Sequence, residues 1–130
     1  MKPFTVFALI TLALLTFGLY QALEVAPKEA TMGDVQRIFY YHLPSAIIAF
    51  LCFFANFGAS VYYLAKRCPK ADAVAITTAE VGVVFCTVVL ITGPLWARPV
   101  WGIWWTWDAR LTSTLVLWLI YVSYLLLRRY

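Results

Sequence analysis

The side chains best suited to chemistry in this sequence gather in one segment, because five of the six tryptophans fall between positions 93 and 110. If the second half of that segment is helical, four of its side chains recur at i, i+3, i+4 and i+7 and therefore share one face. They are Trp101, Trp104, Trp105 and Asp108. This spacing predicts a flat aromatic platform that ends in a carboxylate, flanked by Arg98 and Arg110.

Such a platform suits a large, flat, amphipathic ligand, which would stack on the indoles while the two arginines hold its acidic edge. Haem, a porphyrin that carries propionate groups, fits this description. An interfacial aromatic belt is the alternative, because Trp and Tyr favour the headgroup level of a membrane. Belts are usually sparse at each helix end, whereas this cluster is dense and confined to one segment, which favours the docking surface.

A histidine supplies the second chemical feature. His42 is the only histidine in the chain, and it lies in the segment Arg37–Pro44. A neutral imidazole is a common axial ligand of haem iron. A lone histidine at a membrane surface more often makes an ordinary hydrogen bond to water or to a carbonyl group. Its predicted position on the same side of the membrane as the tryptophans favours His42 as an iron ligand.

The composition indicates which elements must position these residues. The chain of 130 residues is 64% hydrophobic and only 12% charged, whereas a soluble domain is about 25% charged. This excludes a disordered tail and an ordinary cytosolic enzyme. The net charge of +4 comes from scattered basic residues, so no basic stripe for nucleic acid is present. Three cysteines at no useful spacing argue against a zinc site or a disulfide framework.

Four apolar stretches are each long enough for a helix to cross a hydrocarbon core of about 30 Å. We therefore predict an all-α, polytopic membrane protein with four transmembrane helices in a single domain over residues 1–130. The predicted spans are 4–23, 43–65, 73–93 and 111–127. Pro94 is expected to end the third span, because proline lacks the amide donor and clashes with the preceding turn.

The loop charges predict the orientation. Six Lys and Arg residues lie on one side of the predicted spans and four on the other. The positive-inside rule then places both termini in the cytoplasm and the two longer loops, 24–42 and 94–110, outside. Within the second span, Ala55 and Ala59 predict a small face for close helix packing, and Asn56 an interhelical hydrogen bond.

The segment Trp101–Ser113, which reads WGIWWTWDARLTS, resembles the tryptophan-rich "WWD" motif of the haem-handling proteins of cytochrome c biogenesis. Within that group, Arg37–Pro44 most resembles the haem exporter protein C (CcmC) type. The resemblance runs across all four spans. It implies a multi-pass protein of the bacterial inner (plasma) membrane that holds b-type, non-covalent haem at its periplasmic surface, and it implies haem transport and presentation to a periplasmic haem chaperone.

The resemblance also implies partners, namely the membrane and ATPase subunits of an ABC transporter complex. Carried over by position, His42 would be one axial ligand. The haem and chaperone platform would comprise Trp101, Trp104, Trp105, Trp107 and Asp108. Family members usually have six spans and a second histidine in a later external loop. A second chain, or a missing C-terminal half, is therefore expected to complete the haem site of this sequence.

Two other functions stay open at this stage. The chain could be a structural subunit of a transporter or respiratory complex, with the tryptophan segment packed against a partner protein. It could also be a component of a cytochrome c haem lyase that catalyses thioether formation on the same platform. Nothing in the sequence besides the platform would recognise an apocytochrome, so we expect haem handling without enzymatic chemistry.

Overall fold

The computed structural model describes residues 2–129 as four long α-helices and one short π-helix. These elements are α1 (Pro3–Tyr20), η1 (Gln21–Val25), α2 (Gln36–Lys66), α3 (Pro69–Trp101) and α4 (Ala109–Arg129). Four helical segments, with η1 continuing α1, are long and apolar enough to cross a membrane. No strand occurs within residues 2–129. The predicted all-α, polytopic membrane fold with four transmembrane helices is confirmed.

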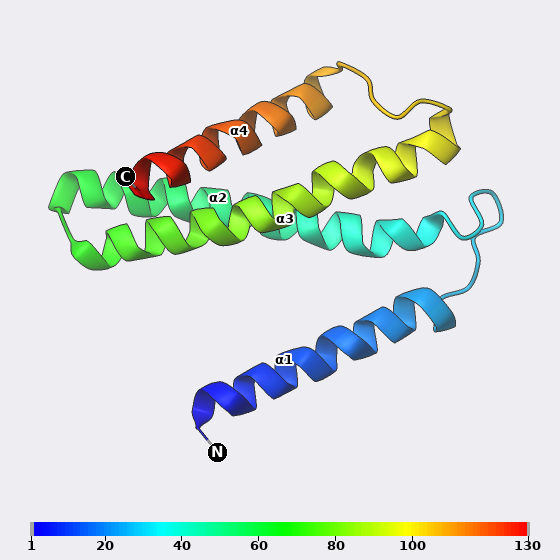
Figure 1. Cartoon of the computed structure of the whole chain (residues 1–130), viewed down its shortest axis with the longest axis horizontal. Coiled ribbons are helices and arrows are strands. Elements are labelled where there is room, and N and C mark those ends of the chain that lie inside the picture. The colour runs from blue at the N-terminus through cyan, green and yellow to red at the C-terminus, as the bar shows by residue number, and fades with distance from the viewer. Residues whose placement is uncertain (1, 130) are drawn as a thin grey trace.

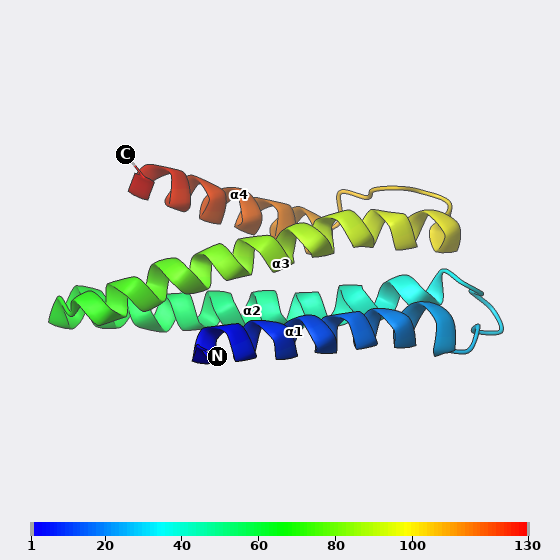
Figure 2. The ribbon, with the colours of Figure 1, turned by 60° about the horizontal axis from the view of Figure 1, so that its bottom comes forward.

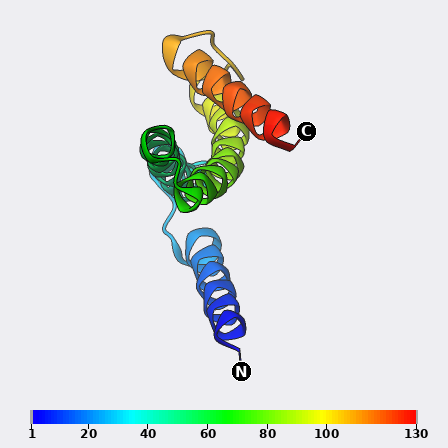
Figure 3. The ribbon, with the colours of Figure 1, turned by 90° about the vertical axis from the view of Figure 1, so that its left-hand side faces the viewer.

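The helices run up and down, so the two longer connections, residues 26–35 and 102–108, lie at the same end of the molecule (Figures 1 and 2). The short turn between α2 and α3 lies at the opposite end, together with the start of α1 and the end of α4. Helices α2 and α3 pack along their length and α4 packs on α3, whereas α1 stands apart and reaches α2 only through η1 (Figure 3).

All four helical segments extend beyond the predicted spans, and the long extensions of α2 and α3 change the site. Helix α2 begins at Gln36, so His42 lies inside a helix and not in the loop before it. The expectation that Pro94 ends the third helix is wrong, since α3 continues through Pro94 and Pro99. A proline inside a membrane helix removes one backbone hydrogen bond without terminating the helix.

Helix α3 ends where the backbone of Gly102 turns left-handed. Gly102 has a φ of 79°, and its N–H donates to the carbonyl oxygen of Arg98 at 2.9 Å. Glycine adopts this conformation without the steric cost that a Cβ atom would bring. The chain then leaves the helix axis and returns as an irregular segment, residues 102–108, toward the start of α4.

Helices α2 and α3 approach closely because a stripe of small residues on α3 faces an aromatic ring on α2. The buried residues of α3 recur every three or four positions over its first half, and they are Ala75, Ala79, Gly82 and Cys86. A Cβ atom added at Gly82 would lie 2.6 Å from Cε1 of Phe53. The phenyl ring therefore rests against the backbone of α3, the kind of contact that small residues permit between membrane helices.

The small face predicted on α2 is packed only in part, since Ala59 is half-buried. Ala55 is exposed, and a Cβ atom added at Gly58 would meet no atom within 4 Å. Helix α2 instead turns Phe53 and Asn56 toward α3. Sequence alone shows which residues are small, but the choice of face depends on where the bulky partner fits.

Asn56 joins three helices, which confirms its predicted interhelical role. Its Nδ2 donates to the carbonyl oxygen of Ala75 at 2.6 Å, and its Oδ1 accepts from the hydroxyl of Tyr121 at 3.1 Å. The ring of Tyr121 also stacks on Phe53, with centroids 4.1 Å apart. A buried amide is stable only when its polar atoms are paired in this way.

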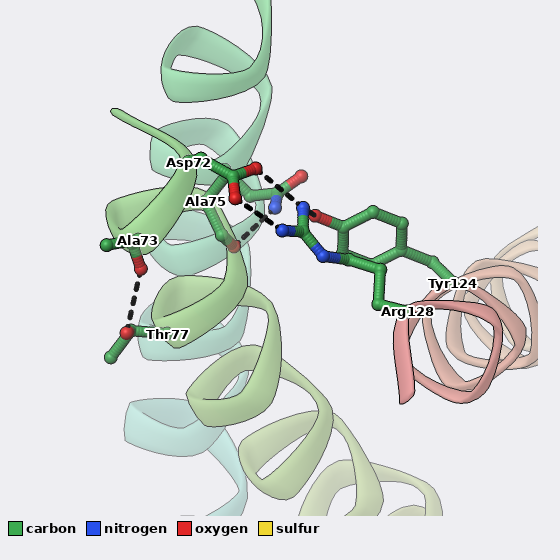
Figure 4. A network of polar contacts seen from close by, with 7 residues as sticks. Asp72, Ala73, Ala75, Thr77, Tyr124 and Arg128 are labelled. Atoms are coloured by element: carbon green, nitrogen blue, oxygen red, sulfur yellow. Dashed lines mark hydrogen bonds and ion pairs between the residues drawn. The ribbon is translucent and has the colours of Figure 1, made fainter. Parts of the chain in front are cut away.

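An ion pair closes the bundle at the end opposite the long loops (Figure 4). The guanidinium of Arg128 on α4 donates two parallel hydrogen bonds to the carboxylate of Asp72 on α3, one of them at 2.8 Å between Nη1 and Oδ1. The same Nη1 donates to the hydroxyl of Tyr124 at 2.9 Å. Bidentate pairing of this kind fixes orientation as well as distance.

Asp108 caps the start of α4. Its Oδ1 accepts the backbone N–H of Leu111 at 2.9 Å, and its Oδ2 accepts the hydroxyl of Thr106 at 2.8 Å. Aspartate is a favoured N-cap because its carboxylate pairs with an amide that has no partner within the helix. These hydrogen bonds, that of Leu111 first, hold the pKa of Asp108 below its usual value.

The contact between Gly82 and Phe53 predicts that Gly82→Ala separates α2 from α3. The added methyl group would overlap a ring that Tyr121 holds in place, and overpacking of this kind costs about 1–3 kcal/mol. The measurement is the free energy of unfolding in detergent, by titration with a denaturing detergent. Gly58→Ala is the matched control, since it adds the same methyl group to open space within a helix and should leave stability equal or slightly higher.

The cap predicts a pH-dependent α4 terminus. Because the folded-state pKa of Asp108 is lowered, the carboxylate stabilises the cap fully above the usual carboxyl pKa, and this contribution is lost as pH falls through the lowered value. Amide exchange protection at Leu111, normalised for intrinsic exchange, should therefore decline at the acid end. Asp108→Asn should remove that pH dependence while keeping an acceptor oxygen, and Asp108→Ala should lower protection at every pH. An acid-end decline that persists in Asp108→Asn would contradict the assignment.

Candidate functional site

A groove opens between α2, the last turns of α3, the 102–108 segment and the start of α4. The groove is partly open to solvent, and the space between its walls is about 620 Å³ when that open part is counted. Its walls are mainly aromatic and aliphatic. Two side chains that can carry positive charge also line it, His42 and Arg110.

His42 lines the groove from the second turn of α2, whereas the sequence predicted that it lies in the loop before the helix. Its Nδ1 lies 2.9 Å from the hydroxyl oxygen of Thr92 on α3. A Cβ atom added at Gly93 would lie 3.5 Å from Cε1 of His42. The absence of a side chain at Gly93 thus lets the imidazole lie close to the backbone of α3 beside the groove.

The predicted single helical face of tryptophans and Asp108 is wrong, since α3 ends at Trp101 and residues 102–108 are irregular. The reversal at Gly102 nevertheless brings the tryptophans of both segments into one groove. They are Trp96, Trp101, Trp104 and Trp105. Two edge-to-face pairs hold the cluster, Trp96 with Trp101 at 5.1 Å between centroids and Trp105 with Trp107 at 5.7 Å.

Two indoles of the groove have unused hydrogen-bonding capacity. The Nε1 atoms of Trp96 and Trp105 are buried, and neither finds an acceptor in the part of the chain that the structure describes. A buried donor without an acceptor costs free energy. A ligand with acceptor atoms in this groove would remove that cost.

The two predicted arginines have different roles. Arg110 lines the groove with its guanidinium carbon 5.6 Å from the centre of the Trp101 ring, and its Nη2 lies 3.7 Å from the carboxylate of Asp108. Arg98 lies outside the lining. Its guanidinium carbon lies 5.6 Å over the ring of Trp104, and its Nη1 donates to the carbonyl oxygen of Gly102 at 2.8 Å.

The structure therefore brings together five of the predicted site residues in the groove, namely His42, Trp101, Trp104, Trp105 and Arg110. It leaves three outside the lining: Arg98, Trp107 and Asp108. The side chain of Trp107 is among the most exposed, at 77%. A binding role for these three stays a prediction.

Sequence reasoning missed two residues of the groove. Trp96 belongs to the same tryptophan cluster, but it lies before the Trp101–Ser113 motif and off the predicted helical face, so it was not among the predicted site residues. Thr92 contacts His42 from a neighbouring helix, and no local motif marks it. Its role depends on the register between α2 and α3.

The groove suits a flat aromatic ligand with an acidic edge better than a bare metal ion. Within residues 2–129 no cluster of three or more His, Cys, Asp or Glu side chains could hold a metal ion. One imidazole can supply a single coordinate bond, the indoles offer stacking faces, and Arg110 offers a guanidinium for a carboxylate.

Comparison with known proteins agrees with this geometry. The family model described as "Heme exporter protein C" (CcmC) matches residues 2–130. The heme exporter protein C of Bradyrhizobium diazoefficiens is 40% identical over 122 residues, which cover 94% of this chain and 46% of that protein. The protein of the same name from Haemophilus influenzae is 38% identical over 121 residues, covering 93% and 49% respectively.

The heme exporter protein C of Escherichia coli K12 is 36% identical over 116 residues, which cover 89% of this chain and 47% of that protein. The chain thus spans about half the length of the curated relatives it matches. Because the family model matches nearly the whole sequence, the resemblance first indicated by the tryptophan motif is confirmed: this chain belongs to the haem exporter protein C (CcmC) family.

Proposed function

We propose that this chain binds haem non-covalently, as b-type haem, in the groove between α2, α3 and α4, and that it does so as a haem-delivery component of cytochrome c biogenesis. The observation that carries the proposal is the groove itself, which combines a single imidazole, four tryptophans and Arg110. Membership of the haem exporter protein C family supports the same proposed function.

Each lining residue has a chemical role toward haem. His42 supplies an axial nitrogen to the iron, and the indoles of Trp101, Trp104 and Trp105 provide faces on which the porphyrin stacks. Arg110, at the start of α4, pairs with a propionate. The buried Trp96 Nε1–H lacks an acceptor in the described residues, and we assign it a hydrogen bond to a polar edge of the ligand. The protein binds and orients haem, and we assign it no bond-making chemistry.

The residues outside the lining suit a partner. Trp107 is exposed, Asp108 follows it at the end of the 102–108 segment, and Arg98 lies in the last turn of α3. We assign this outer rim to a periplasmic haem chaperone, to which the bound haem is presented. The chain holds one histidine, so it offers the iron one imidazole, and a second protein ligand would come from another chain or from a C-terminal half. The membrane and ATPase subunits of an ABC transporter are the proposed partners for export.

Haem retention tests the proposal. The chain is purified in detergent and haem is quantified per chain from the Soret band and by pyridine haemochrome assay. His42→Ala should weaken haem binding by well over tenfold, because even the groups that orient a metal ligand are worth about 10–100-fold. Trp104→Ala and Trp105→Ala should each cost about two- to tenfold, which corresponds to stacking worth about 0.5–1.5 kcal/mol.

Trp107→Ala is the matched control, because Trp107 belongs to the same segment but lies outside the groove lining. It should weaken haem binding less than Trp104→Ala or Trp105→Ala, because it removes only an edge contact to Trp105 and no part of the groove wall, and it should impair transfer to a chaperone. The absence of a Soret band from the unaltered chain would favour a structural subunit. Covalent attachment of haem to an apocytochrome by the purified chain would favour a lyase.

Delivery of haem to a periplasmic chaperone requires the groove to face the periplasm. Both termini then lie on the cytoplasmic side of the inner membrane. In a variant without Cys52, Cys68 and Cys86, a single cysteine at Ile103 should react with an impermeant maleimide added to intact spheroplasts. A cysteine at Lys70, in the turn between α2 and α3, should react only after the membrane is permeabilised. The reverse pattern would place the groove in the cytoplasm.

A further inference from the structure

We infer that Thr92 is a positioning residue for His42, whose tautomer it sets by accepting a hydrogen bond from Nδ1–H. The other ring nitrogen, Nε2, then carries the lone pair and makes no hydrogen bond within the described residues. The relevance of this arrangement to iron binding rests on the proposed function. The tautomer itself does not, since it is a property of the haem-free protein.

The direction of the hydrogen bond follows from what Thr92 does with its single hydroxyl hydrogen. Oγ1 of Thr92 lies 2.7 Å from the carbonyl oxygen of Val88, one turn earlier on α3. A carbonyl oxygen only accepts, so the hydroxyl donates there, as threonine commonly does inside helices. Oγ1 is then an acceptor toward Nδ1 of His42 at 2.9 Å, which requires the proton to be on Nδ1.

The packing of α2 on α3 keeps the two side chains in register. Gly82 faces Phe53 where the helices approach closely. His42 lies about three turns back along α2 from Phe53, and Thr92 lies about three turns forward along α3 from Gly82. Since the helices are antiparallel, both displacements lead to the same end of the molecule (Figure 1). Gly93 adds room for the ring against the backbone of α3.

The contact matters for ligation because a histidine binds metal through its unprotonated nitrogen. A hydrogen bond from the other nitrogen fixes the tautomer, orients the ring and raises the basicity of the ligating atom. Without Thr92 as acceptor the proton is free to occupy either nitrogen. The structure thus assigns Thr92 a part in preparing His42 before any ligand arrives.

The tautomer can be measured directly, because His42 is the only histidine in the chain. Protein labelled with ¹⁵N in histidine alone is studied without haem by NMR, at a pH where the imidazole is neutral. We expect a protonated Nδ1 and an unprotonated, pyridine-like Nε2. Thr92→Val, which keeps the shape and removes the hydroxyl, should shift the proton toward Nε2. Thr92→Ser should restore the original spectrum.

Thr77→Val is the matched control. Thr77 lies on the same helix and donates to the carbonyl oxygen of Ala73 at 2.8 Å, but it is exposed and has no side-chain partner. This variant should leave both His42 signals unchanged. An amide fingerprint like that of the unaltered chain shows that each variant is folded. A proton on Nε2 in the unaltered chain, or an unchanged tautomer in folded Thr92→Val, would overturn the inference.

Haem titration separates this inference from the proposed function. Thr92→Val should weaken haem binding by about 10–100-fold, the usual cost of losing such a partner, and Thr92→Ser should recover most of it. Equal haem affinity in the unaltered chain and Thr92→Val would overturn the positioning role. If the tautomer shifts as expected while no form of the chain binds haem, the contact is supported and the proposed function fails.

Discussion

The close approach of α2 to α3 at Phe53 and Gly82 is the contact on which the rest of the structure depends. In a bilayer the lipid tails are as apolar as the helices, so helix association relies on tight packing and on a few hydrogen bonds. Gly82 allows the ring of Phe53 to reach the backbone of α3. This contact sets the register of the two helices, and everything that pairs across them follows from it.

Two polar contacts illustrate that register. Toward one end of the helices it places Asn56 beside the carbonyl group of Ala75, and toward the other end it places His42 beside Thr92. In the first contact both polar atoms of the Asn56 amide are hydrogen-bonded, since Oδ1 accepts from the hydroxyl of Tyr121. The second leaves Nε2 of His42 without a hydrogen bond among the described residues. The same helix packing thus gives a fully paired amide at Asn56 and an imidazole nitrogen without a hydrogen bond at His42.

The membrane helices, which depend on composition, could be predicted from the sequence. The helix ends and the contacts between helices, which depend on geometry, could be predicted less well. Long apolar stretches identify four membrane helices, because a single segment in lipid satisfies its own backbone only as a helix. Four of the tryptophans that cluster in the sequence also line one groove. The behaviour of Pro94 could not be read locally, since a proline ends some helices and is tolerated inside others. The contact of Thr92 with His42 could not be predicted for a different reason, because the two residues lie fifty positions apart in the sequence.

The predicted helical platform does not form because the chain reverses at Gly102, and this reversal explains the roles of Arg98, just before the tryptophan motif, and Asp108, within it. A continuous helix would have spread these side chains along its axis at about 1.5 Å per residue. The reversal instead folds Trp104 and Trp105 back beside Trp96 and Trp101. An irregular segment of this kind needs its backbone held at both ends.

Arg98 and Asp108 provide that hold. Arg98 donates to the carbonyl oxygen of Gly102 at the start of the segment, and Asp108 accepts from Thr106 and from the first turn of α4 at its end. Non-helical backbone near a membrane is tolerated where its polar groups are paired or line a cavity. Of the three charged side chains in this region, Arg98 and Asp108 therefore stabilise the conformation of the 102–108 segment. Arg110, whose longer ion pair to Asp108 measures 3.7 Å, remains the cation available to a ligand in the groove.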